Sequence, residues 1–248
     1  IITRKKGYSA TWLSPHYGQS NKSLFEVLND CEVSIAPYIW SPRFLMHDLQ
    51  KEVKDGGDGL YKPSGSQQKK VCVFEPNISI NKTCITPIIA IEKFHRSSTH
   101  LLEKAHIFGS SGIRKKKELV NFALGLEVNK DKKLFFEDRY PIVWSLLNHT
   151  DIVLSHHKEN GLNYLYFDAA WLGYPVVHNS EYVKDFGWYY PEEDAEKASA
   201  MLTKVASSFD KNGYYKKYLE KSRKYISKYL PEQQENVDGY GKLIQKLF

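Results

Sequence analysis

The segment from residue 151 to residue 180, DIVLSHHKENGLNYLYFDAAWLGYPVVHNS, constrains the fold more than any other part of the chain. Its short apolar run at 152–154 is typical of a buried parallel strand, and a polar stretch follows at once. Apolar residues then recur at helical spacing from 162 to 172, where Gly173 and Pro175 end the helix before a second apolar run. This order of strand, polar loop, helix and strand is the repeating unit of a parallel α/β sheet.

The polar loop of this segment is a candidate ligand site. Open α/β sheets bind ligands beyond the carboxyl ends of their strands, which is where this loop lies. Its candidate contact residues are His156, His157, Glu159 and Asn160. The helix that follows offers unpaired backbone N–H groups at 160–163, which suit a diphosphate, and Asp168 lies about two turns further along. A histidine at a strand end is ordinarily structural, but here an imidazole is placed to hold a phosphate or a sugar hydroxyl.

Strands alternate with single helices through most of the chain, which predicts a parallel sheet with right-handed crossovers. We expect strands at 70–74, 105–108, 134–136, 151–154, 175–178 and 187–190. We expect helices at 82–94, 115–123, 140–148 and 162–172, and a helical tail at 194–209, 213–229 and 233–247.

The alternation also predicts a domain organisation. Residues 1–55 read as one strand, helix and strand (8–15, 21–29 and 32–39), which is too little for a stable Rossmann-like domain. Residues 56–69 are rich in Gly, Ser and Gln and are expected to be a linker or mobile loop. Residues 70–230 then form a Rossmann-like nucleotide-binding domain, and residues 231–248 a C-terminal helix.

A second candidate site follows the strand at 70–74. Its loop contains Asn77, Asn81, Lys82 and Thr83. Asn81 is placed to cap the next helix, while Lys82 and Thr83 would add charge and hydroxyl contacts to a phosphate. Arg139, at the end of the strand at 134–136, is a phosphate or base contact if it faces the same cleft. The alternatives are a capped surface turn and a salt-bridged surface arginine.

The segment at 151–180 also carries a resemblance. Residues 160–177 are similar to a segment of retaining GT-B glycosyltransferases, in which two acidic residues separated by seven others precede a Gly-x-Pro-Val-Val run. Aligned from that run backwards, Asp168 takes the place of the second acid, which in that class binds the nucleotide ribose. The first acid falls on Asn160, with Glu159 one place away, so the sugar-contacting role is open between these two.

A narrower resemblance is to a glycosyltransferase-like family catalogued mainly as a domain of unknown function. The motifs expected there are W-x-P, a strand that ends in a Glu-Pro-Asn loop, and a His-x-x-Glu-Asn-x-x-Asn-Tyr helix start. This chain contains Trp40-Ser41-Pro42, Glu75-Pro76-Asn77 and the run from His156 to Tyr164 in that order. The resemblance covers roughly residues 8–202.

The resemblance implies a GT-B architecture in which residues 1–55 are the last part of an acceptor-side domain whose earlier strands are absent from this sequence, and the last helix crosses back to it. It implies a nucleotide-sugar donor, with UDP-glucose as the first candidate, and no essential metal in the site. The implied donor-binding residues are Asn77, Asn81, Lys82, Thr83, Arg139, His157, Gly161, Leu162, Asn163 and Asp168. The implied catalytic residues are His156, Glu159 and Asn160, for transfer with retention of configuration. An inverting enzyme would need a base, which could lie in the absent N-terminal part.

Charge and cysteine usage bear on acceptor and compartment. The three cysteines lack metal-ligand spacing and no apolar run spans a bilayer, which favours reduced thiols and a cytoplasmic protein. The formal net charge is +6, and basic residues alternate with tyrosines at 211–228. That pattern suits DNA, or it is an amphipathic helix with solvated lysines. The candidate nucleic-acid contacts are Lys216, Lys217, Arg114 and Lys115.

Three functional interpretations remain open from the sequence. The first is a resemblance to the phage β-glucosyl-hydroxymethylcytosine α-glucosyltransferases, which would add glucose to glucosylated DNA. The second is a transferase that builds surface polysaccharide or glycoprotein glycan, whose basic helices would touch an anionic membrane. The third is a non-catalytic nucleotide or nucleic-acid binding protein on a GT-B scaffold.

Overall fold

A computed structural model describes residues 8–53 and 57–248. The chain divides into two compact units: unit 1 combines Ile1–Ser41 with Ile226–Phe248, and unit 2 is Pro42–Tyr225. Residues 1–7 and 54–56, which belong to the predicted N-terminal unit and the start of the predicted linker, lie outside the described residues. Within the described ranges, no helix is both long and apolar enough to cross a membrane.

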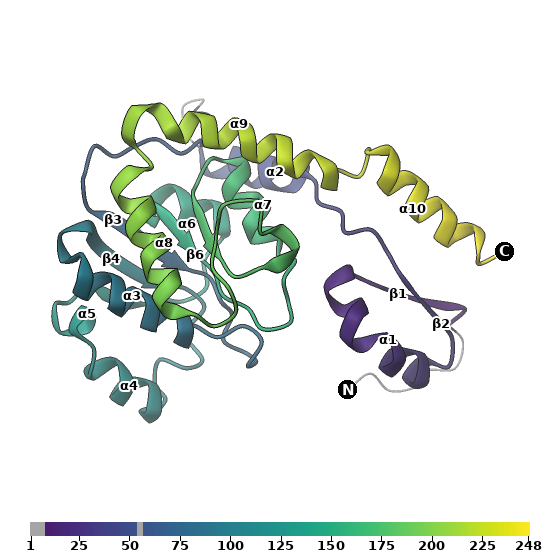
Figure 1. The fold of residues 1–248 in the computed structure, drawn as a ribbon, viewed down its shortest axis with the longest axis horizontal. Coiled ribbons are helices and arrows are strands. Elements are labelled where there is room, and N and C mark those ends of the chain that lie inside the picture. The colour runs from purple at the N-terminus through teal and green to yellow at the C-terminus, as the bar shows by residue number, and fades with distance from the viewer. Residues whose placement is uncertain (1–7, 54–56) are drawn as a thin grey trace. The chain divides into compact units, whose positions relative to one another are not determined.

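Unit 2 is built on a six-stranded sheet in the order β5-β4-β3-β6-β7-β8 (Figure 1). The strands are β3 (Lys69–Val73), β4 (Leu102–Ile107), β5 (Leu134–Phe136), β6 (Ile152–Leu154), β7 (Val176–His178) and β8 (Trp188–Tyr189). Every pairing in this sheet is parallel. The chain order reverses between β3 and β6, which is the switch point where a doubly wound sheet opens a crevice for a ligand.

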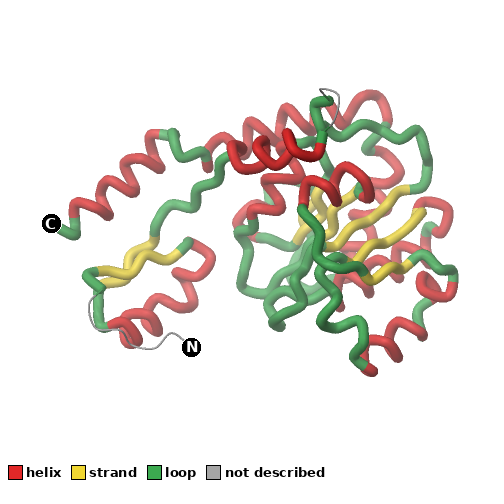
Figure 2. The backbone as a smooth tube through the Cα atoms, turned by 180° about the vertical axis from the view of Figure 1, so that it is seen from behind, coloured by secondary structure: helices red, strands yellow, loops and turns green. Residues whose placement is uncertain are grey.

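Helices cover both faces of this sheet (Figure 2). They are α2 (Pro42–Glu52), α3 (Ile85–Ser97), α4 (Lys117–Leu124), α5 (Glu127–Lys130), α6 (Ile142–His149), α7 (Tyr164–Trp171), α8 (Ala195–Ser208) and α9 (Tyr214–Ile226). Helix α3 packs against α8, whereas α2 packs against α6 and α7. All residues of β6 and β7 are buried, as continuous apolar strands between two helical layers must be.

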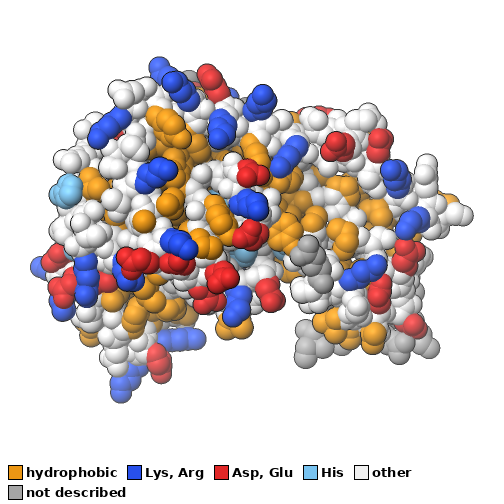
Figure 3. Space-filling view, in the orientation of Figure 1, with side chains coloured by type: hydrophobic (Ala, Val, Ile, Leu, Met, Phe, Trp, Pro, Cys, Tyr) orange, Lys and Arg blue, Asp and Glu red, His pale blue; other side chains and the backbone are white. Residues whose placement is uncertain are grey.

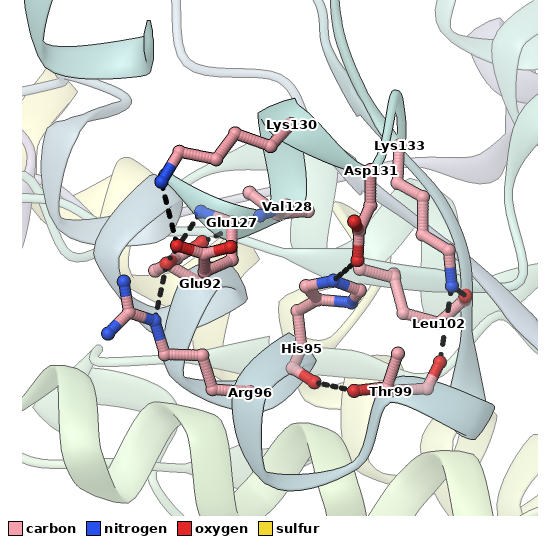
Figure 4. Close-up of polar contacts among 10 residues, drawn as sticks. All are labelled: Glu92, His95, Arg96, Thr99, Leu102, Glu127, Val128, Lys130, Asp131 and Lys133. Atoms are coloured by element: carbon pink, nitrogen blue, oxygen red, sulfur yellow. Dashed lines mark hydrogen bonds and ion pairs between the residues drawn. The ribbon is translucent and has the colours of Figure 1, made fainter. Parts of the chain in front are cut away.

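A buried carboxylate fastens α5 to α3 (Figure 4). The carboxylate of Glu92 accepts hydrogen bonds from the N–H groups of Glu127 and Val128, each at 2.9 Å, and from Nε of Arg96 at 2.6 Å. Burial alone would raise the pKa of Glu92, but the N–H groups of Val128 and Glu127 together with Arg96 hold it below its ordinary value. Close by, His95 contacts Asp131 at 2.7 Å. These contacts fix the chain just before β5.

Unit 1 contains β1 (Ala10–Leu13), α1 (Pro15–Asn29), β2 (Glu32–Ile35) and α10 (Gln234–Gln245). The two strands pair in parallel. Helix α10 belongs to this unit because Tyr240 Oη donates to the carbonyl of Pro37 at 3.0 Å and its ring meets that of Trp12 edge-on at 6.2 Å. The N–H of Trp40 also donates to the carbonyl of Tyr229 at 2.8 Å.

The predicted α/β fold with a partial second Rossmann-like unit is confirmed, and the differences concern particular elements. Helix α2 was not predicted, because apolar residues occur on both of its faces: Leu45 is buried, while Phe44 is 80% exposed. Helix α1 begins at Pro15 rather than at residue 21. Helices α3 and α7 begin later than expected, at Ile85 and Tyr164, because the loops before them have their own hydrogen bonds.

Candidate functional site

A cavity of about 540 Å³ opens at the carboxyl end of the unit 2 sheet. Its walls come from the ends of β3, β4 and β5 and from the first turns of α7. The lining residues are Phe74, Pro76, Lys82, Phe108, Gly109, Arg139, Tyr140, Pro141, Ile142, Asn163, Leu165 and Asp168. The volume is in the range of cavities that hold small ligands, and the location is the crevice that doubly wound sheets use. We call it the donor cavity.

Aromatic rings form one wall of the donor cavity. The rings of Phe74 and Phe108 stack with centroids 5.0 Å apart and planes 10° apart, and Tyr140 meets Phe108 edge-on at 6.1 Å. Tyr140 is 42% exposed, so part of its ring is open to a ligand. Gly109 follows with φ +69°, and a Cβ there would lie 3.2 Å from the carbonyl oxygen of Glu75. This wall suits a flat ring such as a nucleobase.

Two cations line the same cavity. Neither Lys82 nor Arg139 forms an ion pair with any residue that the structure describes. Burial lowers the pKa of Lys82, and the nearby Glu75 carboxylate opposes that shift. Cations that line a concave site without forming an ion pair attract an anionic ligand. The cavity therefore combines a surface for an aromatic ring with positive charge for phosphate.

Behind Lys82 lies a buried carboxyl group. Oε1 of Glu75 accepts the hydroxyl hydrogen of Ser155 at 2.6 Å and the N–H of His156 at 3.1 Å, and the residue is 1% exposed. Burial raises the pKa of Glu75, while the Ser155 hydroxyl, Lys82 and the His156 N–H act against that shift. Glu75 thereby joins the end of β3 to the end of β6, across the switch point of the sheet.

The loop before α3 differs from its predicted arrangement. Asn81 does not cap the helix: its Nδ2 donates to the carbonyl of Lys158 at 3.0 Å, and the N–H of Lys158 donates back to the carbonyl of Asn81 at 2.7 Å. Oδ1 of Asn77 instead accepts the N–H of Cys84 at 2.8 Å, just before the helix. Thr83 Oγ1 accepts from Ile85 at 3.4 Å. The prediction failed because a shorter helix leaves the loop free to pair with the β6–α7 loop.

The β6–α7 loop is held by its own hydrogen bonds. The hydroxyl of Tyr190 donates to the carbonyl of Ser155 at 3.1 Å, so Nδ1 of His156, 3.1 Å from the same hydroxyl, must carry a proton and donate to it. Burial lowers the pKa of His156, which keeps the imidazole neutral with Nε2 as an acceptor. The side chain of Asn179 accepts from the N–H of His157 and donates to its carbonyl.

The residues proposed as catalytic lie in this loop beside the donor cavity, not in its lining. Nδ1 of His157 accepts the N–H of Asn160 at 3.1 Å. Glu159 is exposed and has φ +54°, a conformation that an L residue adopts only when its surroundings fix it. His156 is 5% exposed. Within unit 2, this loop is therefore adjacent to the cavity and ordered by local contacts.

Helix α7 brings the predicted ribose contact to the cavity. Asn163 caps the helix, with Oδ1 accepting the N–H of Leu165 at 3.2 Å. The helix begins at Tyr164, so Asp168 lies just over one turn from its start rather than two. This later start places both Asn163 and Asp168 in the cavity lining.

The structure gathers four of the predicted donor-binding residues: Lys82, Arg139, Asn163 and Asp168 line one cavity. The other predicted donor contacts, Asn77, Asn81, Thr83, His157, Gly161 and Leu162, shape the two neighbouring loops. Sequence reasoning missed the aromatic wall and Gly109. The only signal for them was their position: Phe74 and Phe108 end predicted strands, Gly109 follows one, and Tyr140 begins a predicted helix.

The predicted nucleic-acid contacts fall into two separate patches. Lys216 and Lys217 lie on α9, which packs on the β8 edge of the sheet, where Tyr214 and Tyr218 meet Trp188. Arg114 and Lys115 precede α4, close to the β5 edge, and Arg114 pairs with Asp138 at 3.3 Å. Tyr218 is buried and Tyr215 and Tyr225 are half-buried, while Tyr214 and the lysines of α9 are exposed, as an amphipathic helix predicts.

No cluster of three or more His, Cys, Asp or Glu side chains suitable for a metal ion occurs among the described residues. The three cysteines, Cys31, Cys72 and Cys84, are free thiols.

Comparisons with known proteins agree with the architecture. No curated protein matches the sequence. The pneumococcal O-GlcNAc transferase GtfA, solved in complex with UDP and GlcNAc, aligns with a TM-score of 0.57 at 11% identity, over 96% of this chain and 45% of that chain. WaaG, a glycosyltransferase involved in lipopolysaccharide biosynthesis, gives 0.56 at 16% identity, over 94% and 61%. TarM of S. aureus gives 0.56 at 15% identity, over 85% and 43%.

At these identities the likeness shows the fold, which is of the GT-B type. The chain spans about half the length of the solved structures that it matches. Its sequence also matches a family model over residues 1–244, in agreement with the predicted resemblance. The chain belongs to the family described as "Protein of unknown function (DUF2827)".

Proposed function

We propose that this protein is a glycosyltransferase that binds a nucleotide sugar in the donor cavity and transfers its hexose. The observation that carries the proposal is the cavity itself, where an aromatic wall, two cations without protein ion-pair partners and the Asp168 carboxylate converge at the sheet's switch point. Solved proteins of the same fold, GtfA and TarM, were crystallised with UDP, which supports a nucleotide-diphosphate donor.

Each part of the cavity has a role in this proposal. The nucleobase lies against Tyr140 and the stacked phenylalanines, and Asp168 accepts a hydrogen bond from a ribose hydroxyl. Lys82 and Arg139 bind the diphosphate. Charge develops on that group as the sugar leaves, and fixed cations stabilise it. In a retaining reaction the acceptor attacks on the face from which the diphosphate departs, and the donor phosphate assists its deprotonation.

The His156–Asn160 loop would contact the sugar. Neutral His156 offers Nε2 as an acceptor for a sugar hydroxyl, and Glu159 and Asn160 share the place of the first acid of the GT-B motif. No metal is assigned a role. Donor binding measured by calorimetry with and without EDTA tests this: equal affinity supports a metal-free site, and a loss that Mg²⁺ restores contradicts it.

Calorimetric titration of the whole chain with UDP and UDP-glucose is the direct test of the donor proposal. Asp168→Asn should weaken UDP binding roughly tenfold, because a ribose hydroxyl loses a charged acceptor. The matched control is Asp48→Asn on α2, a carboxylate whose side chain is 55% exposed. Equal effects of the two changes, or no binding of any nucleotide by the folded protein, would refute the donor cavity.

Two acceptor classes follow from different observations. The basic exposed face of α9 favours a polyanion, for which glucosylated hydroxymethylcytosine in phage DNA is the specific candidate. The printed role of WaaG in lipopolysaccharide biosynthesis favours a surface glycan instead. The separation of the basic residues on α9 from those before α4 reduces the area that one duplex could cover on unit 2.

Transfer from radiolabelled UDP-glucose separates these classes. The acceptors are unmodified DNA, hydroxymethylated DNA, DNA β-glucosylated on hydroxymethylcytosine, and a lipopolysaccharide core extract. Label on the third DNA alone establishes the DNA enzyme, and label on the extract alone establishes the glycan enzyme. Binding of UDP-glucose with neither hydrolysis nor transfer would identify a non-catalytic nucleotide-binding protein.

A further inference from the structure

A second hollow lies between β8, α8 and α9, away from the donor cavity. It consists of two adjoining cavities of about 230 and 410 Å³ that share Trp188, Lys204, Tyr214 and Lys217. We call it the α9 hollow. It opens at the amino end of β8, whereas the donor cavity lies at the carboxyl ends of β3, β4 and β5. The two sites are therefore at opposite ends of the same sheet.

Charge in the α9 hollow is unbalanced. Its lysines are Lys204, Lys211, Lys217 and Lys221, and its one carboxylate is that of Asp185. None of the four lysines forms an ion pair with a residue in the described part of the chain. On the face of Figure 3 over α8 and α9, basic side chains surround exposed hydrophobic ones. Like charges held around one hollow repel each other until an anion enters.

The floor of the hollow is aromatic and carries two buried hydroxyls. Trp188 is 9% exposed and Tyr218 5%, while Tyr214 is 47% exposed at the rim. The hydroxyls of Tyr218 and Ser222, one turn apart on α9, are buried within reach of each other, and that of Tyr218 also lies near the backbone of Val176. Burial raises the pKa of Tyr218, so its hydroxyl stays protonated and remains a donor. Buried hydroxyls that pair mainly with each other keep hydrogen-bonding capacity that a polar ligand can use.

We propose that the α9 hollow binds a phosphorylated or sulfated sugar ring, at a site separate from the donor cavity. Lys204, Lys217 and Lys221 would hold the anionic group. The ring lies under Tyr214, and its hydroxyls meet Asp185 and the buried hydroxyls of α9. A sugar phosphate matches all three features, because it combines a compact anion with many hydroxyl groups.

Single-stranded nucleic acid fits the hollow less well. Proteins that bind it offer a long basic groove with several exposed rings on which successive bases stack. Here Tyr214 is the exposed ring among the described aromatic residues of the hollow, and the nearly buried Trp188 presents little of its face. One compact anionic ring is therefore the better match.

The first test is isothermal titration of the whole chain with glucose 6-phosphate, glucose and inorganic phosphate. We expect glucose 6-phosphate to bind at least tenfold more tightly than either fragment, because the hollow contacts both anion and ring. Binding should weaken as salt rises. Phosphate as tight as glucose 6-phosphate would overturn the sugar site, and tighter binding of an eight-nucleotide single-stranded DNA would replace it with a nucleic-acid site.

Substitutions test whether glucose 6-phosphate binds in the α9 hollow. Lys204→Gln, Lys217→Gln and Lys221→Gln together should weaken glucose 6-phosphate roughly tenfold or more. The matched control, Lys115→Gln with Lys116→Gln and Lys117→Gln, removes equal charge from exposed residues at and before the start of α4 and should leave affinity unchanged. Equal losses in both would mean non-specific attraction and refute the site. Ser222→Ala should weaken the sugar phosphate and leave phosphate unchanged; no difference would refute the role of the buried hydroxyls.

The test is independent of the proposed transferase activity. Glucose 6-phosphate binding should persist in Lys82→Ala, which alters the donor cavity, and its loss there would assign the ligand to that cavity instead. Failure of UDP to bind leaves this prediction standing, and failure of glucose 6-phosphate leaves the donor proposal standing.

Discussion

The two ends of the unit 2 sheet differ in whether their buried or cavity-lining cations form ion pairs. At the amino end, Lys69 is 3% exposed and its Nζ lies 2.5 Å from Asp210, which also accepts the hydroxyl hydrogen of Tyr61 at 2.8 Å. At the carboxyl end, Lys82 and Arg139 line an open cavity and form no ion pair with a described residue. The paired charges at the amino end stabilise the fold, whereas the cations at the carboxyl end lie where we propose that an anion binds. The α9 hollow is the exception at the amino end.

The largest expected effect is on stability at the amino end. Lys69→Ala leaves the partly buried Asp210 without its cation and should lower the free energy of unfolding by about 3–4 kcal/mol. The matched control is Lys93→Ala, whose partner Glu196 is 76% exposed, and it should cost less than about 1 kcal/mol. Urea unfolding measures both. A small change in unfolding free energy for Lys69→Ala, together with weakened UDP binding, would contradict the assignment of the amino-end ion pair to stability.

A buried neutral histidine at the carboxyl end makes stability depend on pH. Burial lowers the pKa of His178 from 6.5 to about 4, and its Nε2–H donates to the carbonyl of Phe186 at 2.7 Å. The unfolded chain therefore binds a proton at higher pH than the folded chain. As pH falls from 6.5 to 4, the free energy of unfolding should decrease by about 3 kcal/mol through this residue.

Urea unfolding across this pH range checks the histidine prediction. His178→Gln removes the titrating group, so its unfolding free energy should fall less steeply between pH 6.5 and 4 than that of the wild type. Burial also lowers the pKa of His106 and His156, which leaves a residual slope of the same sign. An unchanged slope in the variant would show that the fold does not lower the pKa of His178.

The third effect is on function at the carboxyl end. Lys82→Ala should lower kcat/KM with UDP-glucose about a hundredfold, through loss of diphosphate stabilisation, with under about 1 kcal/mol change in unfolding. Burial lowers the pKa of Lys82, so this lysine loses its proton at a lower pH than an ordinary lysine does. As pH rises, wild-type UDP affinity should therefore begin to fall at a lower pH than it would with an ordinary lysine. Lys130→Ala, at an exposed ion pair with Glu127, is the control. A large stability loss with intact activity would assign Lys82 to the structure.

The smallest expected effect is on stability, at the buried Glu92 carboxylate that joins α5 to α3. Glu92→Gln keeps the shape but leaves one carbonyl oxygen to accept the bonds from Glu127, Val128 and Arg96, and should cost about 2 kcal/mol. Because the fold holds the Glu92 pKa below 4.5, its contribution is present above that pH and is lost as pH falls through the folded pKa. Thermal unfolding at pH 7 tests the cost, and UDP affinity should be unchanged.

Much of the architecture could be predicted from the alternation of apolar and helical patterns. The strand order could not, because it depends on which strand pairs with β3. That order decides that Arg139, from the β5 loop, shares a cavity with Lys82, from the β3 loop. From the sequence, each residue is a separate candidate phosphate contact, and the fold places both in one cavity.

The aromatic wall was missed for a different reason. Phe74 and Phe108 end predicted buried strands, so their apolar character reads as core, and only the fold shows that their rings face a cavity. The basic residues were identified from the sequence, but whether they form one surface could not be predicted. A sequence does not show on which surface a charged residue lies. In the structure, the basic residues before α4 and those on α9 lie near opposite edges of the sheet.

The reciprocal hydrogen bonds between Asn81 and Lys158 also affect the dynamics of the two loops. They tie the loop before α3 to the loop before α7, while Asn179 ties the second loop to the carbonyl of Glu192. Loops joined in this way open together rather than one by one. Amide hydrogens at 81–83 and 157–160 should therefore exchange with solvent at similar rates. If UDP binds as proposed and contacts only the first of these loops, through Lys82, it should slow exchange in both.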